Sequence, residues 1–124
     1  TMVGALGRLQ VVTVLIVEDD EVYGYALSKA LRAAGRHPIL CDGWTDYLAR
    51  LETDQCAKSV VLDVRLPEGT PNGLALARMT RMKRPGLNLI VVSNDPALLV
   101  DLPDGARGFP KSASLADIAA AAND

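Results

Sequence analysis

A chain of 124 residues with 49% hydrophobic and 23% charged residues is long enough to form one domain with its own core, and this composition argues against a disordered chain. The formal net charge of −2 and the lack of a long basic run argue against a nucleic-acid surface, and no apolar run is long enough for a membrane span. Cys41 and Cys56 form no CxxC motif and His37 is the single histidine, so zinc sites and Cys-His or Ser-His-Asp catalysis lack support. Without a signal segment at the start of the chain, we expect a cytoplasmic protein.

The start of the chain predicts a leader, a buried strand and a helix. Residues 1–10 show little periodicity and are expected to precede a domain that covers residues 11–124. Residues 11–17 form an apolar run, which is typical of a strand buried on both faces. Residues 22–34, Val22 included, carry apolar side chains at helical spacing, and Gly35 is expected to end this helix as a left-handed cap.

The middle of the chain repeats this alternation. A short apolar strand is predicted over residues 38–41, a turn at Asp42-Gly43 and a short helix over residues 45–51. The third strand is predicted over residues 59–62 and ends on Asp63. Residues 64–72 contain two prolines and a glycine, so they cannot form regular structure.

The last part of the chain predicts two strands and three helices, of which the middle helix is short because Pro103 and Gly105 follow it quickly. The basic residues between Arg78 and Arg84 are predicted to form a solvated helix face. The first helix is capped by Asn72, has Met82 in its apolar content and ends at Pro85, and a strand over 89–92 then finishes at Ser93. The second helix is capped by Asp95 and is followed by a weak strand over 106–109. The last helix begins with a partial capping box at Ser114.

Five β-α repeats predict an α/β protein with a doubly wound, five-stranded parallel sheet in the order 2-1-3-4-5. We expect helices on both faces of the sheet and a shortened fourth helix. Doubly wound sheets bind their ligands outside the carboxyl ends of the strands, at the point where the strand order reverses. The functional residues are therefore expected just after the strands.

Charged and hydroxyl side chains stand at these strand ends: Glu18, Asp19, Asp63, Ser93 and Lys111. Neighbouring strands lie roughly 5 Å apart, so the predicted order brings Asp63 beside Glu18 and Asp19. Carboxylates can hold Mg²⁺, and Asp63 can attack a phosphoryl group whose charge Lys111 neutralises and to which Ser93 donates a hydrogen bond. The alternative is that Asp63 caps a turn and Lys111 is a solvent-exposed cation.

Four motifs together resemble the receiver domain of two-component response regulators: residues 14–20, 60–67, 91–93 and 109–112. The resemblance implies that Asp63 accepts phosphate from a sensor histidine kinase or a phosphotransfer protein. It implies a magnesium ion bound by Asp19, Asp63 and the backbone carbonyl of Arg65, with Glu18 acting through water. Ser93 would be the switch hydroxyl and Lys111 the lysine that contacts phosphate.

The same resemblance implies a signalling domain and not an enzyme, since it would catalyse only its own phosphorylation and dephosphorylation. The expected partners are the kinase or phosphotransfer protein, and a downstream effector or a second copy of the chain. Neither nucleic acid nor a membrane is expected to bind this chain directly.

The sequence also departs from the family pattern. The loop at residues 68–72 is longer than usual, and Gly108 stands where the family carries its switch aromatic, which leaves Phe109 as the candidate. These departures keep open a degenerate receiver that binds proteins without phosphorylation. Two further alternatives fit less well: a haloacid-dehalogenase-type phosphatase needs a D-x-D pair after a strand, and a flavin or nucleotide binder needs a Gly-rich or Ser/Thr-rich phosphate loop after the first strand.

Overall fold

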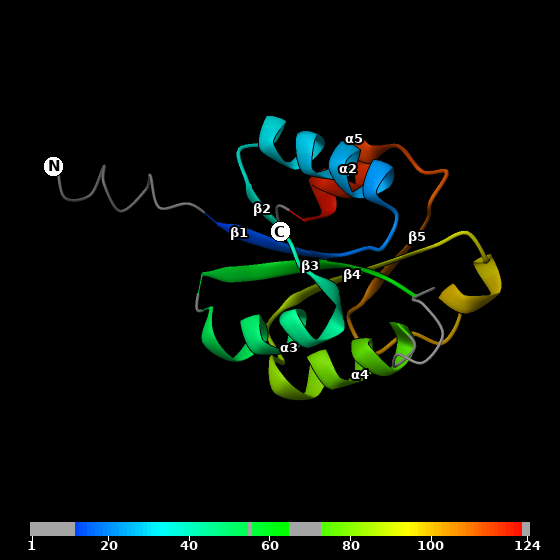
Figure 1. Cartoon of the computed structure of the whole chain (residues 1–124). Coiled ribbons are helices and arrows are strands. Elements are labelled where there is room, and N and C mark those ends of the chain that lie inside the picture. Colours follow the sequence, from blue (N-terminus) through cyan, green and yellow to red (C-terminus); the bar gives the residue numbers. More distant parts are fainter. Residues whose placement is uncertain (1–11, 55, 65–72, 123–124) are drawn as a thin grey trace, which may run out of the picture.

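The computed structural model describes residues 12–54, 56–64 and 73–122, which form a three-layer α/β domain around one parallel sheet (Figure 1). The strands run in the order β2-β1-β3-β4-β5 and all neighbouring pairs are parallel. The predicted fold class and strand order are therefore confirmed. The strands are β1 (Thr13–Val17), β2 (His37–Leu40), β3 (Ala57–Asp63), β4 (Asn88–Ser93) and β5 (Arg107–Pro110).

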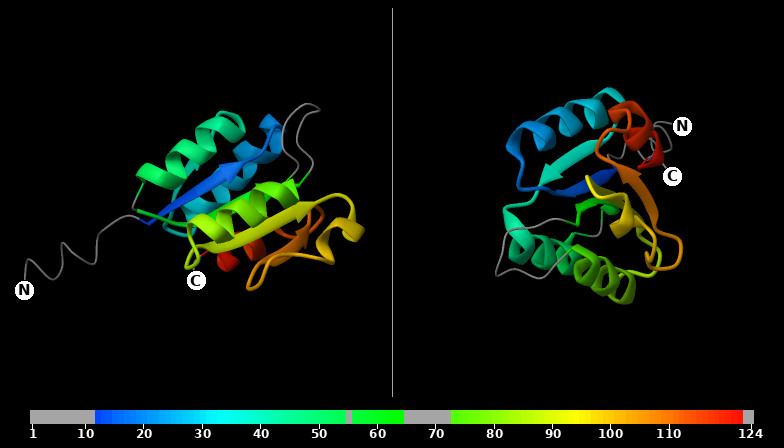
Figure 2. Two further views of the ribbon diagram at one scale, coloured as in Figure 1. Left: turned by 90° about the horizontal axis from the view of Figure 1, so that it is seen from below. Right: turned by 90° about the vertical axis from the view of Figure 1, so that its right-hand side faces the viewer.

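Two pairs of helices cover the two faces of the sheet, as Figures 1 and 2 show. One face carries α2 (Glu21–Ala33) and α5 (Leu115–Ala121), and the other carries α3 (Gly43–Thr53) and α4 (Gly73–Lys83). The connection between β4 and β5 holds only the 3₁₀ helix η1 (Pro96–Leu99). The shortened fourth helix of the prediction is this single 3₁₀ element.

The apolar strands supply both halves of the core because successive side chains of a strand point to opposite faces. In β1, Leu15 and Val17 pack on the side of α3 and α4, whereas Val14 and Ile16 pack on the side of α2 and α5. All four side chains are at most 1% exposed. The unbroken apolar run of β1 thus follows from its place inside a sheet that is covered on both sides.

The predicted ends of three helices can be compared with the structure. Asp20 caps α2 by accepting hydrogen bonds from the backbone N–H groups of Val22 and Tyr23. Gly35 follows α2 with a φ of 82°, as a left-handed cap requires. Asp95 caps η1 through the N–H of Ala97, as predicted.

Ser114 precedes α5, but its side chain accepts no capping hydrogen bond. The partial capping box is therefore not formed, although the helix starts where it was expected. Asp117 in the first turn still places a negative charge near the amino end of the helix, where it is favourable.

Several predicted boundaries and burials were wrong. The second strand starts at His37 and ends at Leu40, and α3 begins at Gly43, so Asp42 precedes a helix and not a simple turn. Val22 is 81% exposed and Met82 is 82% exposed. The buried stripe of α2 passes through Leu27, and Val22 lies five residues earlier, which is about 140° around the helix from that stripe.

Some predictions fall on residues that the structure does not describe. They are the leader at residues 1–10, most of the loop at 64–72 with the carbonyl of Arg65, and the cap at Asn72. None of the helices in the described ranges has the length and apolar character needed to cross a bilayer.

Candidate functional site

Three carboxylates meet at the carboxyl edge of the sheet, between β1 and β3. The register pairs Val17 with Leu62, so the residues that follow them in the chain, Glu18 and Asp63, come to lie side by side. Glu18 is 8% exposed and Asp63 is 2% exposed, while Asp19 is exposed. One oxygen from each of these three carboxylates lies within 4.8 Å of the others.

Lys111 reaches this carboxylate group from beyond β5. Its Nζ lies 2.9 Å from Glu18 Oε1 and 3.4 Å from Asp63 Oδ2. The lysine side chain is only 14% exposed, and its backbone N–H donates to the carbonyl of Ser93. Lys111 is therefore not the solvent-exposed cation of the alternative reading, and Asp63 faces a charge partner.

Ser93 ends β4 beside this group and is fully buried. Its Oγ accepts a hydrogen bond from the backbone N–H of Asp95 at 3.0 Å. That bond uses an oxygen lone pair, so the hydroxyl proton remains free of this contact and can be donated to another group. The bond also ties Ser93 to the residue that caps η1.

Electrostatics favour a cation at this site. Burial raises the pKa of Glu18 to about 7, against the opposing hydrogen bonds from Lys111 and the backbone of Asp20. Burial lowers the pKa of Lys111, but the contacts with Glu18 and Asp63 outweigh it, so the lysine pKa is raised overall. Glu18 Oε2 is buried and has no hydrogen-bond partner among the described residues. Clustered carboxylates with one unpaired buried oxygen fit a hard divalent cation, whose preferred ligands are oxygen atoms.

One predicted site residue, the candidate switch aromatic Phe109, is not part of the carboxylate group. Phe109 is half-buried and packs against the part of the core beneath α2 and α5. A Cβ at the neighbouring Gly108 would lie 3.0 Å from Leu102 Cδ1 and 3.2 Å from Leu99 Cβ. Leu99 of η1 and Leu102, three residues later, thus occupy the space beside Gly108, the position at which the family pattern carries its switch aromatic. The carbonyl of Arg65 lies outside the described residues.

Tyr23 is a site residue that the sequence reasoning missed. Lys111 Nζ lies 4.9 Å from the centroid of its ring, a distance at which cation–π attraction operates. The signal was present in the helical spacing, because Tyr23 stands four residues before the buried Leu27 and so lies on the inner stripe of α2. Its nearness to Lys111 depends on the packing of α2 beside the end of β5.

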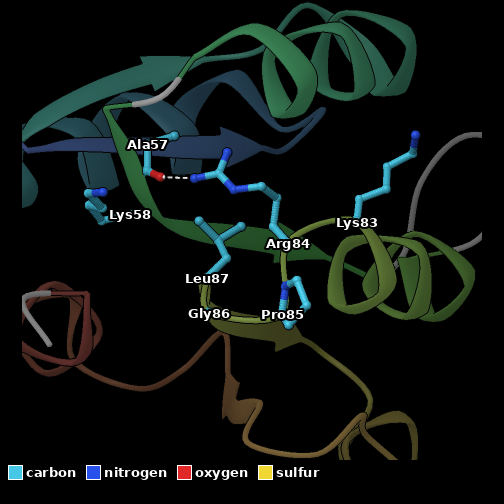
Figure 3. A pocket seen from close by; sticks show the side chains of 7 residues that line it. All are labelled: Ala57, Lys58, Lys83, Arg84, Pro85, Gly86 and Leu87. Carbon is cyan, nitrogen blue, oxygen red and sulfur yellow. Dashed lines mark hydrogen bonds between the residues drawn. The ribbon is translucent and has the colours of Figure 1, made fainter.

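The basic helix face of the prediction was wrong for Arg84, which is half-buried at the opposite, amino-terminal edge of the sheet. Its guanidinium donates to the carbonyls of Leu51, Asp54 and Ala57 at 3.1, 3.4 and 2.6 Å. Figure 3 shows Arg84 lining a pocket there and bonded to Ala57. These bonds join the end of α3 to the start of β3, so this pocket is held together by a structural arginine.

Arg84→Met is expected to lower the free energy of unfolding by about 2 kcal/mol, because three carbonyl groups lose a charged donor. Urea unfolding monitored by circular dichroism measures the change. Arg78→Met is the matched control, since the ion pair of Arg78 with Asp101 is 4.0 Å long and both side chains are largely exposed. Equal stabilities of the two variants would show that the Arg84 bonds contribute nothing.

Comparison with known proteins agrees with this geometry, although no family model matches the sequence. A response regulator receiver protein from Pseudomonas putida is 28% identical, has a TM-score of 0.78, and is matched over 92% of this chain and 97% of its own. The chain is a response-regulator receiver domain. A receiver protein from Sinorhizobium medicae has the same fold, with a TM-score of 0.81. It is 21% identical, and the match covers 93% of this chain and 94% of that chain.

One curated relative of this receiver domain is the DNA-binding transcriptional regulator NtrC of Azospirillum brasilense, which is 30% identical over 96 residues. The match covers 77% of the receiver domain but only 19% of the relative's length. A third structure, from Burkholderia pseudomallei, is 23% identical with a TM-score of 0.76 over 89% of this chain and 65% of that chain, and it contains a phosphorylated aspartic acid, a calcium ion and citrate. Receiver domains are signalling domains and not classical enzymes.

Proposed function

We propose that this receiver domain is a phosphoacceptor in two-component signalling, in which Asp63 takes a phosphoryl group from a sensor histidine kinase or a phosphotransfer protein. The observation that carries the proposal is the group of three carboxylates within 4.8 Å of one another, with Lys111 paired to both of its buried members. A buried carboxylate held beside a cation can attack phosphorus while its surroundings neutralise the incoming charge.

Magnesium is the proposed cofactor, with Asp19, Asp63 and the backbone carbonyl of Arg65 as direct ligands and Glu18 acting through water. Asp19 is exposed and so can exchange water for a metal ion, and Glu18 Oε2 is a buried acceptor without a partner among the described residues. When bound, the ion supplies positive charge to the oxygens of the transferred group. The Burkholderia structure contains both a phosphorylated aspartic acid and a calcium ion, which supports a divalent cation here.

The residues of the chain divide the remaining work. An oxygen of Asp63 forms the bond to phosphorus as the bond between phosphorus and the donor breaks, which leaves an aspartyl phosphate. Lys111, now paired with Glu18 and Asp63, is proposed to neutralise one phosphoryl oxygen. Ser93 is proposed to donate its hydroxyl proton to another phosphoryl oxygen and to shift toward it. Because the backbone N–H of Asp95 bonds to Ser93 Oγ, this shift of Ser93 would also move η1.

The proposed output is a change in contacts with a downstream effector protein or with a second copy of the domain. The DNA binding in the name of the Azospirillum relative belongs to that protein, since this chain spans about a fifth of its length (19%). No nucleic-acid contact or membrane contact of this chain is part of the proposal. A cytoplasmic location, where a kinase could supply the phosphoryl group, is part of it.

A small-molecule phosphodonor tests the proposal directly. The protein is incubated with Mg²⁺ and acetyl phosphate, and its intact mass is measured. A gain of about 80 Da, the mass of one phosphoryl group, is the expected result. Omitting Mg²⁺ or adding a chelator is expected to prevent most of the gain, while folded protein that gains no mass with Mg²⁺ present would reject phosphoacceptor function.

A degenerate receiver, which binds partners without phosphorylation, is the second candidate. The observation in its favour is the space beside Gly108, which Leu99 and Leu102 fill in place of a switch aromatic. A phosphorylated chain whose partner binding does not respond to the phosphoryl group would support this candidate for the output step. The carboxylates and Lys111 favour a domain that does accept a phosphoryl group, whatever its effect on partner binding.

Asp19→Asn is expected to weaken Mg²⁺ binding about tenfold, since it replaces a direct carboxylate ligand with a neutral amide. Isothermal titration measures the affinity. Asp20→Asn is the matched control, because Asp20 caps α2 and asparagine caps a helix equally well. An Asp19→Asn affinity equal to that of the control would remove Asp19 from the ligand set.

A further inference from the structure

Tyr23 lies on the first turn of α2 with its ring beside the ammonium group of Lys111. The distance from Lys111 Nζ to the ring centroid is 4.9 Å. We propose that Tyr23 is a positioning residue for phosphoryl transfer, which holds Lys111 against Glu18 and Asp63 through its aromatic face. This inference rests on the proposed function, because it assigns Tyr23 a role in the same reaction.

The contacts of Lys111 show what the ring adds. The two carboxylates lie 2.9 and 3.4 Å from Nζ, and the ring provides a further, uncharged contact that excludes water from the ammonium. A lysine side chain has several rotatable bonds and a strongly hydrated head, so an ion pair alone leaves it able to turn toward solvent. The face of an aromatic ring attracts a cation without competing with a phosphoryl oxygen for a hydrogen bond.

Tyr23 is itself held firmly enough for this role. Its backbone N–H donates to the capping carboxylate of Asp20 at 3.1 Å, and its side chain packs against the core beneath α2 and α5. The hydroxyl of Tyr23 is buried and has no hydrogen-bond partner in the described part of the chain. A buried hydroxyl without a partner does not stabilise a fold. The contact of the ring with Lys111 therefore gives a reason for an aromatic side chain at this position, whereas hydrogen bonding gives none.

The role becomes important when Asp63 is phosphorylated. Lys111 then has to move from an aspartate oxygen to a phosphoryl oxygen, and during this movement its pairing with Asp63 is interrupted. The ring keeps the ammonium beside the carboxylates through this change. Leucine at position 23 would fill similar space without an aromatic face, so Lys111 would spend part of its time in solvent.

The rate of phosphorylation by acetyl phosphate at saturating Mg²⁺ tests this role. Tyr23→Leu is expected to slow the reaction about 3- to 10-fold, the range that a cation–π contact accounts for. Tyr23→Phe keeps the ring, so its phosphorylation rate is expected to stay within about twofold of the wild-type rate. Tyr25→Leu is the matched control on the same helix, because Tyr25 is 63% exposed and lies beside Lys29 and not Lys111.

Proton NMR of the Lys111 ε-methylene group provides a readout that does not depend on phosphorylation. The ring is expected to shift these protons upfield in the unchanged protein and in Tyr23→Phe, and the shift is expected to be lost in Tyr23→Leu. An absent shift would overturn the contact itself. A Tyr23→Phe variant as slow as Tyr23→Leu would overturn the role of the ring and assign the effect to the hydroxyl.

The same assays separate this inference from the proposed function. If the unchanged protein gains no phosphoryl group, the proposed function fails and the positioning role fails with it, whatever the NMR shift. If the unchanged protein is phosphorylated and Tyr23→Leu reacts at the same rate, the positioning role alone is overturned.

Discussion

Asp63→Asn is expected to abolish formation of the acyl phosphate and to leave the fold intact. An amide oxygen is a far weaker nucleophile than a carboxylate oxygen, and the two side chains have nearly the same shape. Asp63 is 2% exposed and lies beside Glu18, so the substitution also removes a like-charge neighbour from a buried group. Lys111 keeps its 2.9 Å contact with Glu18, and the lysine is therefore not left unpaired.

Intact mass after incubation with Mg²⁺ and acetyl phosphate measures this effect, and circular dichroism checks the fold. Asp42→Asn is the matched control, since Asp42 is exposed and its side chain makes no capping bond to α3. The control is expected to gain about 80 Da like the unchanged protein. A similar gain by Asp63→Asn would place the phosphoacceptor on another residue.

Gly73→Ala is expected to lower the free energy of unfolding by at least about 3 kcal/mol, at the upper end for overpacking. A Cβ at Gly73 would lie 2.1 Å from Val64 Cα and 2.6 Å from the carbonyl oxygen of Asp63. These are backbone atoms, so no side-chain rotation can relieve the clash. The start of α4 therefore packs directly on the backbone of Asp63 and Val64, and only glycine permits that approach.

The substitution is also expected to slow phosphorylation, because relief of the clash has to displace Val64 or Asp63. Urea unfolding measures the stability, and the intact-mass assay measures the rate. Gly86→Ala is the matched control, since a Cβ at Gly86 would meet nothing within 4 Å. A Gly73→Ala protein as stable as this control would show that the space between α4 and the end of β3 is wide enough for a Cβ at position 73.

Much of the fold was predictable because local sequence and global fold agree. The apolar runs within β1, β3 and β4 are typical of strands covered on both faces, and their alternation with amphipathic segments favours a parallel sheet. The pairing of β1 with β3 then brought Glu18 next to Asp63. Boundaries shifted by one or two residues at β2 and α3, where the apolar runs are short and a neighbouring polar residue can join either element.

The composition of the candidate site was also determined by the sequence, since its acidic, hydroxyl and basic side chains follow the strands at the edge where a doubly wound sheet binds its ligands. The surroundings of those side chains depended on tertiary structure. Lys111 meets Glu18 across 93 residues of chain and Arg84 meets Leu51 across 33, and no periodicity records such a contact. The Lys111 contact of Tyr23, the three carbonyls on Arg84 and the close approach at Gly73 all arise where elements distant in the chain pack together. A side chain's type and spacing show which face it occupies, but its partners are decided by the packing of the helices on the sheet.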